Sequence, residues 1–385
     1  MKSTKQTNTA QPPHNSRREF TRGALAAAAL TGAGMLAPRR AKAQPTVTPE
    51  VKWRMATSWP TNFPIFEHGA LRFAANVAAM SGGRMQIEVD SASKHKAALD
   101  VFDYVREGQF EMGHSCSYYW KGKDASLTTL AAMPFGMNAQ EFNAWFWYDG
   151  GIELMNAAYA RHGMYSYNAG NTGVQMGGWF RKEIKSPADF HGLKMRIPGL
   201  AGEVLARIGA EPVVIPAGEL YTSLERGVID ALEWVGPHMD VSMGFQQIAK
   251  FYYTGWHEPG TELQYLINRN KYDALPEDLR RILQVAMRES SFDMLCESEY
   301  RNAQTWAQMH QDYPDVQIRS FPREVLDALR RETNAVLDEM IAASPESAAI
   351  IDSQRAFLKK AAAWTAVSRG DFYRVRELTG ADLMA

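Results

Sequence analysis

The sequence predicts an α/β protein with two lobes and a cleft between them. A strand–helix–strand–helix–strand pattern occurs twice, over residues 53–114 and again over residues 193–234. At 385 residues, the chain is also longer than a single compact core usually accommodates. Two α/β units in such a chain are expected to form separate lobes, and strands that cross between the lobes leave a cleft.

The first unit is predicted from alternating apolar residues and from glycines that end helices. Gly108 precedes the third strand of this unit, just as Gly227 precedes the last strand of the second unit. The expected strands are Trp53–Ser58, Arg84–Val89 and Phe110–His114, and the expected helices are Ile65–Met80 and Ala97–Glu107.

The second unit carries polar residues where its strands end. Arg196 closes the first strand, and Glu233, followed by Trp234, closes the last. Ligands of α/β proteins bind at the carboxyl ends of parallel strands. A guanidinium can hold both oxygens of a carboxylate, and a buried glutamate needs a cationic partner. The pattern predicts a site for a carboxylate and a cation, although Arg196 alone is also compatible with a surface ion pair to Asp189 or Glu183.

Gln175 is a further candidate for the same site. It lies in the apolar stretch Gly173–Trp179, where a polar side chain is unusual. An amide oxygen is a suitable ligand for a hard cation such as sodium or calcium. A hydrogen bond within the sheet is the alternative interpretation, and both remain open at this point.

The rest of the chain is predicted to be mostly helical. The helix expected at Glu277–Tyr313 is longer than the diameter of one lobe, so it should bridge both lobes or contact a partner. The aromatic segment Met133–Tyr159 should be helical from Ala139, with most of its rings in the core. Further elements are a strand at Leu263–Ile267 and amphipathic helices at Glu324–Ala343 and Glu346–Thr379, the latter broken near Gly370.

The N-terminus resembles an export signal. Residues 1–43 hold eight Lys/Arg and one Asp/Glu, a charge of +7, which leaves −8 for the remaining chain. A twin-arginine pair, Arg17-Arg18, precedes the apolar run Gly23–Ala37 and the small-residue site Ala41-Lys42-Ala43. That run is shorter than the ~20 residues of a membrane-spanning helix. We therefore expect twin-arginine export, cleavage after Ala43 and a soluble periplasmic protein, rather than a disordered basic tail or an anchor.

Other classes of function are disfavoured by what the sequence lacks. The acidic remainder has no basic stretch for nucleic acid. Gly113–Ser117 begins like a nucleophile elbow but lacks the closing glycine, and no glycine-rich phosphate loop follows a strand. The nine histidines show no metal-ligand spacing. Cys116 and Cys296 are expected to be buried free thiols, although an oxidising compartment also permits a bridge between them.

Long motifs in the chain resemble one family of transport proteins. The chain is similar to the substrate-binding subunit of tripartite ATP-independent periplasmic (TRAP) transporters, and especially to the α-keto-acid receptors. The general family motifs are Asp189–Arg196, Gly209–Pro212 and Glu219–Glu233, and the subgroup motifs are Tyr118–Asp124, Gly170–Trp179, Glu233–Pro237 and Gly255–Gly260. The similarity covers essentially the whole chain after the leader.

The resemblance implies a two-lobed periplasmic solute-binding protein fold with a hinged cleft, a long lobe-spanning helix and extra C-terminal helices. It implies a receptor, not an enzyme, that delivers a small monocarboxylate, such as the 2-oxo acid pyruvate, to a TRAP permease. A dimer through the C-terminal helices is also implied. The expected divisions are signal peptide 1–43, lobe I at 44–170 plus about 260–320, lobe II at 171–259, and C-terminal helices at 321–385.

The resemblance also implies roles for particular residues. Arg196 should hold the ligand carboxylate. A sodium ion, or calcium in its place, should be bound by oxygens of Gln175, Glu233 and the Trp234 carbonyl. Tyr119 and Trp234 are expected to form walls of the site, and Glu258 to lie on its hinge side and contact the substrate.

Two alternatives to this receptor and one departure from its family remain. An exported metal-dependent lyase or oxidoreductase could use the carboxylates Glu233 and Glu258. A binding component of an ATP-driven importer shares the two-lobed architecture.

The departure is the loop Asp90–Leu99, where family members usually carry an apolar loop. Its charged residues Lys94, His95 and Lys96 would alter specificity if the loop reached the cleft, and would not if it faced solvent.

Overall fold

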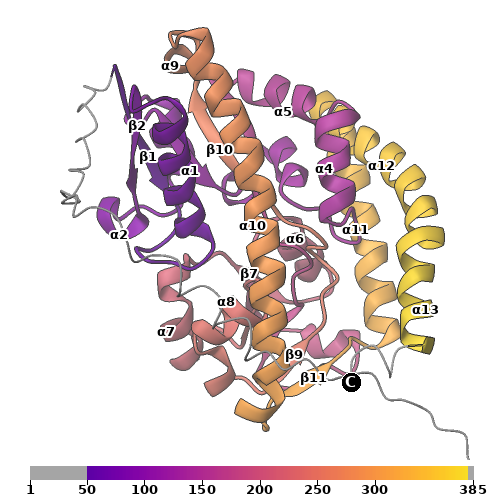
Figure 1. Ribbon diagram of the computed structural model, residues 1–385. Coiled ribbons are helices and arrows are strands. Elements are labelled where there is room, and N and C mark those ends of the chain that lie inside the picture. Colours follow the sequence, from indigo (N-terminus) through magenta and orange to yellow (C-terminus); the bar gives the residue numbers. More distant parts are fainter. Residues whose placement is uncertain (1–49, 380–385) are drawn as a thin grey trace, which may run out of the picture. The chain divides into compact units, whose positions relative to one another are not determined.

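The computed structural model describes residues 50–379 and contains two β-sheets surrounded by helices (Figure 1). The first sheet has the strand order β2-β1-β3-β10-β4. Strand β1 pairs in parallel with β2 and β3, whereas β10 is antiparallel to β3 and β4. The bounds are β1 Val51–Thr57, β2 Met85–Asp90, β3 Met112–Ser115, β4 Met164–Asn171 and β10 Glu262–Asn268.

Helices α1 (Phe66–Met80) and α3 (Val101–Arg106) connect the first three strands, which confirms the first predicted unit. The helix expected at Ala97–Glu107 is shorter than predicted. A separate turn of helix, α2 (Ala92–His95), precedes it and ends at Lys96, whose φ of 66° is left-handed. Residues 97–100, where the helix is expected to begin, form a turn instead, and α3 starts at Val101.

The second sheet has the strand order β11-β9-β5-β8-β6-β7. Strand β6 pairs in parallel with both β7 and β8, and α6 (Gly199–Arg207) and α7 (Leu220–Glu225) connect them, so the second predicted unit is also confirmed. The bounds are β5 Gly178–Phe180, β6 Lys194–Arg196, β7 Glu211–Val213, β8 Ala231–Leu232, β9 Phe251–Tyr253 and β11 Gln317–Arg319.

Strand β11 differs from the expected division of the chain. The stretch to about residue 320 was assigned to lobe I, but Gln317–Arg319 pairs in parallel with β9 in the second sheet. Backbone pairing at the open edge of β9 decides the position of this short strand. The other lobe boundaries stay a prediction.

Helix α10 (Glu277–Asp312) is the long helix that the sequence predicts after Pro276. It packs against α1 and β4 of the first sheet and against α8 (Pro237–Ser242) beside the second, so it spans both (Figure 1). A Cβ on Gly170 would lie 2.0 Å from the sulfur of Met294, so any larger residue there would displace this side chain of α10.

The segment after β11 forms the expected C-terminal helices. Helix α11 (Arg323–Ala343) packs on α6, and α12 (Pro345–Thr365) packs on α11 and on α5 (Gly151–Ala160). A π-helical turn, η6 (Ala366–Gly370), separates α12 from α13 (Asp371–Thr379), which confirms the predicted break near Gly370. The remaining elements are α4 Ala139–Tyr148, α9 Arg269–Asp273, η1 Ser117–Trp120, η2 Ala125–Leu130, η3 Pro187–Phe190, η4 Ala217–Glu219 and η5 Phe245–Gln247.

Aromatic residues of the segment Met133–Tyr159 lie in the core, as predicted. Phe142, Trp145 and Phe146 of α4 are buried in a cluster with strands of the first sheet. Cys116 and Cys296 are both free, as predicted, but Cys296 is exposed on α10 rather than buried. Within residues 50–379, no helix combines the length and apolar character needed to cross a bilayer.

The charged loop after β2 faces solvent. Lys94 has a side chain that is 55% exposed and forms ion pairs with Glu88, at 2.7 Å, and with Asp90. The ring of His95 contacts the backbone oxygen of Thr57 at 2.9 Å. The charge of Lys94 is therefore balanced locally, which supports the interpretation in which this loop leaves specificity unchanged.

Candidate functional site

Parallel pairing of β6 and β8 brings Arg196 next to Glu233. Arg196 is opposite Leu232 in the register of the two strands, and Glu233 follows directly. Both side chains are 1% exposed. Arg196 Nη1 donates to the backbone oxygen of Glu233 at 3.0 Å and to its carboxylate Oε1. The alternative of a surface pair with Asp189 or Glu183 is thereby excluded.

Two further contacts fix the guanidinium of Arg196. Its Nε donates to the backbone oxygen of Ile215 at 3.3 Å, and its Cζ lies 5.0 Å from the ring centroid of Trp234. Burial acts to lower the pKa of Arg196, but the electrostatic interaction with Glu233, together with those with Tyr119, Tyr118 and Glu258, outweighs it, so the pKa is raised. Its Nη2 has one weak contact, 3.5 Å from the hydroxyl of Tyr119. This edge of Arg196 therefore retains donor capacity.

Tyr119 comes from the first sheet's side of the molecule, in η1 just after β3. Burial raises the pKa of Tyr119, so its hydroxyl stays neutral. Across from it, Trp234 packs edge-on against Phe63, with ring centroids 5.8 Å apart, and also contacts Phe66. Residues from both α/β units thus enclose the edge of Arg196.

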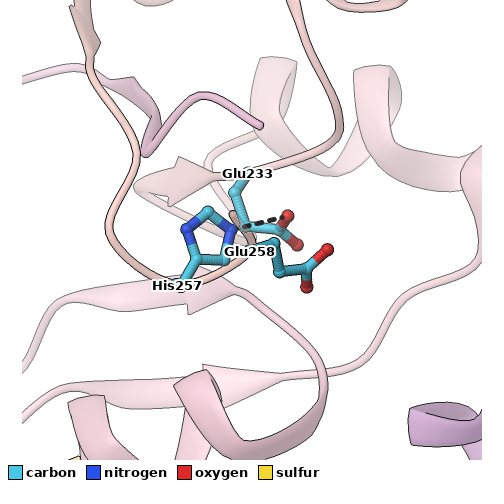
Figure 2. Close-up of side chains that lie close together, drawn as sticks. All are labelled: Glu233, His257 and Glu258. Carbon is cyan, nitrogen blue, oxygen red and sulfur yellow. Dashed lines mark hydrogen bonds and ion pairs between the residues drawn. The ribbon is translucent and has the colours of Figure 1, made fainter. Parts of the chain in front are cut away.

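The second oxygen of Glu233 is occupied by a histidine (Figure 2). His257 Nε2 lies 3.2 Å from Glu233 Oε2, and the His257 side chain is fully buried. Burial acts to lower the pKa of His257, but the hydrogen bond to Glu233 and the charge of Glu258 outweigh it and raise the pKa. Glu233 is therefore shared between two basic side chains.

Glu258 is a buried carboxylate in a different situation. Among the described residues it forms no ion pair with arginine or lysine, and its Oε2 accepts a hydrogen bond from the hydroxyl of Thr261. Burial, followed by the charge of Glu233, raises its pKa to about 7. Ligand atoms of Glu233, His257 and Glu258 all lie within 4.8 Å of one another, which is close enough to hold a metal ion (Figure 2).

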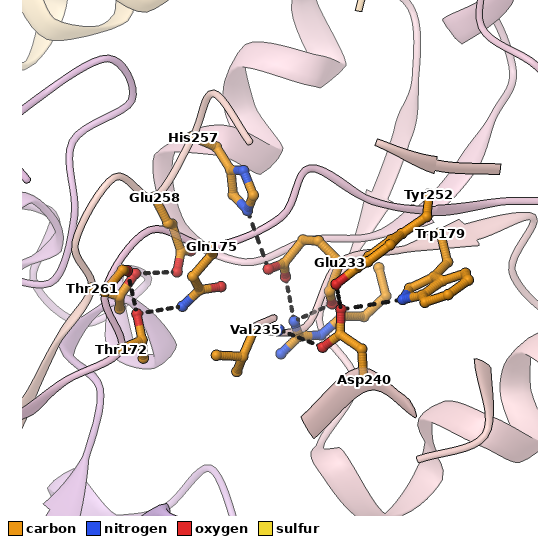
Figure 3. Close-up of polar contacts among 12 residues, drawn as sticks. Thr172, Gln175, Trp179, Glu233, Val235, Asp240, Tyr252, His257, Glu258 and Thr261 are labelled. Carbon is orange, nitrogen blue, oxygen red and sulfur yellow. Dashed lines mark hydrogen bonds and ion pairs between the residues drawn. The ribbon is translucent and has the colours of Figure 1, made fainter. Parts of the chain in front are cut away.

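Gln175 lies beside this group (Figure 3). Its backbone N–H donates to the backbone oxygen of Glu258 at 3.0 Å, and its Nε2 donates to Thr172 Oγ1 at 3.2 Å. A Cβ on Gly255 would lie 1.9 Å from the backbone oxygen of Gln175, so a glycine permits this contact.

The amide oxygen of Gln175 is buried and has no hydrogen-bond partner within residues 50–379. An unsatisfied buried acceptor costs about 1–3 kcal/mol, and such groups usually have a structural or functional reason. The oxygen atoms of Gln175 and Glu258 are the ligand type that sodium and calcium prefer. The residues present therefore fit a hard cation.

The sequence does not single out His257, and it predicts Glu258 on the hinge side of the site in contact with the substrate, or beside Glu233 as a catalytic carboxylate in the enzyme alternative. The structure places both beside Glu233, although they are distant from it in sequence. It also joins Arg196 and Glu233, which were expected to act separately, in one ion pair. The family motif Gly255–Gly260 contains both residues and is the sequence signal that could have revealed them.

Comparison with known proteins places this geometry in a family. The family described as DctP, bacterial extracellular solute-binding protein, family 7, matches residues 55–344. The chain belongs to this family. Its members are solute-binding receptors, so the interpretation of the chain as a receptor rather than an enzyme is confirmed, and the alternative of an exported lyase or oxidoreductase has no support.

Individual family members share most of the receptor's length. A monocarboxylate 2-oxoacid-binding periplasmic protein of Nostoc is 37% identical over 353 residues, which cover 91% of this chain and 96% of that protein. A TRAP periplasmic solute-binding protein from Pseudoalteromonas atlantica, solved with bound sodium and pyruvate, is 50% identical, with a TM-score of 0.83 over 84% of this chain and 98% of its own.

A third relative adds a different ligand. A TRAP transporter solute-binding protein from Bordetella bronchiseptica is 33% identical, with a TM-score of 0.84 over 87% of this chain and 100% of its own. It was solved as a mixed-occupancy dimer, with copurified calcium and picolinate in one active site and an apo site in the other. These likenesses confirm the two-lobed α/β fold class predicted for the receptor.

Proposed function

We propose that this receptor binds a small 2-oxo monocarboxylate such as pyruvate, together with sodium or calcium, and presents it to the membrane permease of a TRAP transporter. The observation that carries the proposal is a buried group in which Arg196 pairs with Glu233, the carboxylate of Glu233 clusters with that of Glu258, and the amide oxygen of Gln175 is unsatisfied. The guanidinium of Arg196 and the oxygen atoms available for a metal ion together suit a small molecule that can itself chelate the metal.

The ligands of the relatives support this choice. Pyruvate carries a keto oxygen on the carbon next to its carboxylate, and picolinate carries a ring nitrogen in the same position. Each molecule can therefore hold a cation through two atoms while a carboxylate oxygen remains for an arginine. The name of the Nostoc relative specifies monocarboxylate 2-oxo acids.

Arg196 holds the ligand carboxylate in this proposal. Its Nη1 is committed to Glu233, whereas Nη2 faces the hydroxyl of Tyr119. A carboxylate placed between Arg196 and Tyr119 would accept hydrogen bonds from both and satisfy the donor edge. The indole Nε1 of Trp234, which is buried without a partner among the described residues, is a further donor beside it.

Gln175 and Glu258 are the side chains that would hold the cation, with the Trp234 carbonyl as a third ligand. Glu233 was also expected to bind it, but its two oxygens already contact Arg196 and His257. We therefore assign Glu233 chiefly to orienting Arg196. When bound, the cation supplies charge that offsets the buried carboxylates and the ligand. In this proposal the ligand binds the closed form more tightly than the open form and therefore shifts the lobes toward closure. The permease would then recognise the closed form.

A thermal shift panel tests the proposed ligand class. Binding to the folded state raises Tm as ligand exceeds Kd. We expect pyruvate and other small 2-oxo acids to raise Tm in sodium or calcium, but much less in a buffer with potassium as its cation. Hydroxy acids and sugar acids should give smaller shifts. A panel in which no 2-oxo acid stabilises the protein, with either cation, would refute the assignment.

We also propose that the chain is exported through the twin-arginine pathway and forms a homodimer. The signal lies outside the described residues. Support for the dimer comes from large apolar side chains on the last helices: Trp364, Val367 and Phe372 are 67%, 69% and 59% exposed. An exposed apolar face of this kind is typical of an interaction surface. The C-terminal helices of a second copy are the partner that we propose.

Native mass spectrometry of protein recovered from the periplasm tests both points. We expect a dimer of chains that begin at Gln44, which dissociates in the double variant Trp364→Glu, Phe372→Glu. A matched variant in which the exposed Tyr148, on a different helix, becomes glutamate should remain dimeric. A chain that retains Met1 would contradict the export proposal, and a monomeric wild-type protein would contradict the dimer.

A further inference from the structure

Asp240 is a fully buried carboxylate just outside the proposed site (Figure 3). It lies in α8 and its two oxygens contact different partners. Oδ2 accepts hydrogen bonds from the indole Nε1 of Trp179, at 3.2 Å, and from the hydroxyl of Tyr252, at 2.8 Å. Oδ1 accepts a hydrogen bond from the backbone N–H of Val235 at 2.9 Å.

The two aromatic donors form a rigid support. Trp179 and Tyr252 lie opposite each other on the paired strands β5 and β9, and their rings stack with centroids 4.0 Å apart and an interplanar angle of 15°. Both rings are buried. Because this pair anchors Oδ2, the position of Oδ1 is also fixed. The N–H group of Val235, which donates to Oδ1, is therefore held in place.

The N–H of Val235 belongs to the same planar peptide group as the carbonyl of Trp234. In a trans peptide these two groups point in opposite directions, so a carboxylate on the N–H side directs the carbonyl oxygen away from itself. The next carbonyl, that of Val235, accepts from the backbone N–H of Met176 at 2.9 Å, beside Gln175. The peptide groups on both sides of Val235 are therefore held.

We infer that Asp240 is a positioning residue for the cation site: it orients and polarises the Trp234 carbonyl through the N–H of Val235. This inference rests on the proposed function, in which that carbonyl is a cation ligand. A hydrogen bond to the N–H end of a peptide makes its carbonyl oxygen more negative, because bonds in a chain polarise one another. A carboxylate does this better than a neutral acceptor.

The structure also predicts that asparagine would hold the Val235 peptide less well than Asp240 does. Its three neighbours, Trp179, Tyr252 and Val235, all donate, so both oxygens must accept. An asparagine offers one oxygen and one NH2 group. Either Val235 or the aromatic pair would then face a second donor, and the peptide would lose its fixed orientation.

The experiment measures pyruvate binding by calorimetry as a function of sodium concentration, with calcium as a parallel series. We expect Asp240→Asn to raise the sodium concentration for half-maximal binding by about 10–100-fold, the usual effect of losing an outer-shell partner. At saturating sodium its affinity for pyruvate should return to near the wild-type value. Tyr252→Phe, which keeps Oδ1 but removes one anchor of Oδ2, should give a smaller shift in the same direction.

A matched control separates positioning from general stability. Glu141→Gln removes a buried carboxylate that caps α4 and is hydrogen-bonded to Asn138 and Thr365 rather than to the Asp240 group, so it should leave the sodium requirement unchanged. An unchanged sodium requirement in folded Asp240→Asn, or in Tyr252→Phe if the first variant does not fold, would overturn the inference. A wild-type protein that binds pyruvate equally well without sodium or calcium would instead refute the proposed cation site.

Discussion

Replacing Arg196 with alanine is expected to abolish pyruvate binding. The guanidinium is buried, held on one side by Glu233 and Ile215, and presents its other edge toward Tyr119. Truncating one partner of a buried, hydrogen-bonded charge pair costs about 2–5 kcal/mol, and each 1.4 kcal/mol is a factor of ten in affinity. Quenching of tryptophan fluorescence should report the loss, because Trp234 lies 5.0 Å from the guanidinium.

The variant Arg196→Ala also leaves Glu233 buried with His257 as its remaining basic partner. Breaking a buried pair typically destabilises a protein by about 3–5 kcal/mol, so unfolding must be measured alongside binding. Arg196→Lys serves as the matched variant. It keeps the positive charge but lacks the planar fork, so it should bind pyruvate weakly while retaining more stability. Wild-type affinity in a folded Arg196→Ala protein would contradict the assigned role.

The second large effect is expected from Glu258→Gln. Removing the anionic oxygen should raise the sodium requirement for pyruvate binding beyond the measurable range. The free energy of unfolding of the ligand-free protein should increase or stay unchanged. Burial raises the pKa of Glu258 to about 7, so near neutral pH the ionised carboxylate carries a cost that a neutral amide avoids. Calorimetric binding and thermal unfolding of the same preparation measure the two effects.

Glu262 supplies the control for Glu258. It is also buried, with a pKa raised by burial to about 8, but it accepts hydrogen bonds from Asn171 and Ser291 instead of joining the cluster. Glu262→Gln should leave the sodium requirement near that of the wild type. If Glu258→Gln kept wild-type sodium dependence while Glu233→Gln lost it, the cation would belong to Glu233, as the sequence first indicated.

The fold and half of the site could be predicted from local patterns. Alternating apolar residues and the helix-ending Gly108 and Gly227 define both β-α-β-α-β units. Parallel pairing then places residues at strand ends side by side, which is why Arg196 and Glu233 could be predicted to share one edge of a sheet. Periodicity carries this information because each of these residues belongs to a regular element or lies close to the end of one.

The other half of the site comes from irregular segments. His257 and Glu258 lie between β9 and β10, and Asp240 lies in a short helix, so none follows a strand of its own unit directly. Their roles depend on which buried donors and acceptors meet in space. The sequence pattern around a single histidine or aspartate does not show which donors or acceptors it will contact in the folded protein. The placement of Gln317–Arg319 in the second sheet escaped prediction for a similar reason, since backbone pairing decided it.

A crystal structure of the exported protein with pyruvate and sodium tests the central claim most directly. We predict that the ligand carboxylate contacts Arg196 and Tyr119, and that the cation is coordinated by the ligand, the amide oxygen of Gln175, the carboxylate of Glu258 and the carbonyl oxygen of Trp234. The account would be contradicted by pyruvate bound away from Arg196. It would also be contradicted by a pyruvate complex without a cation, in which Gln175 and Glu258 contact only protein.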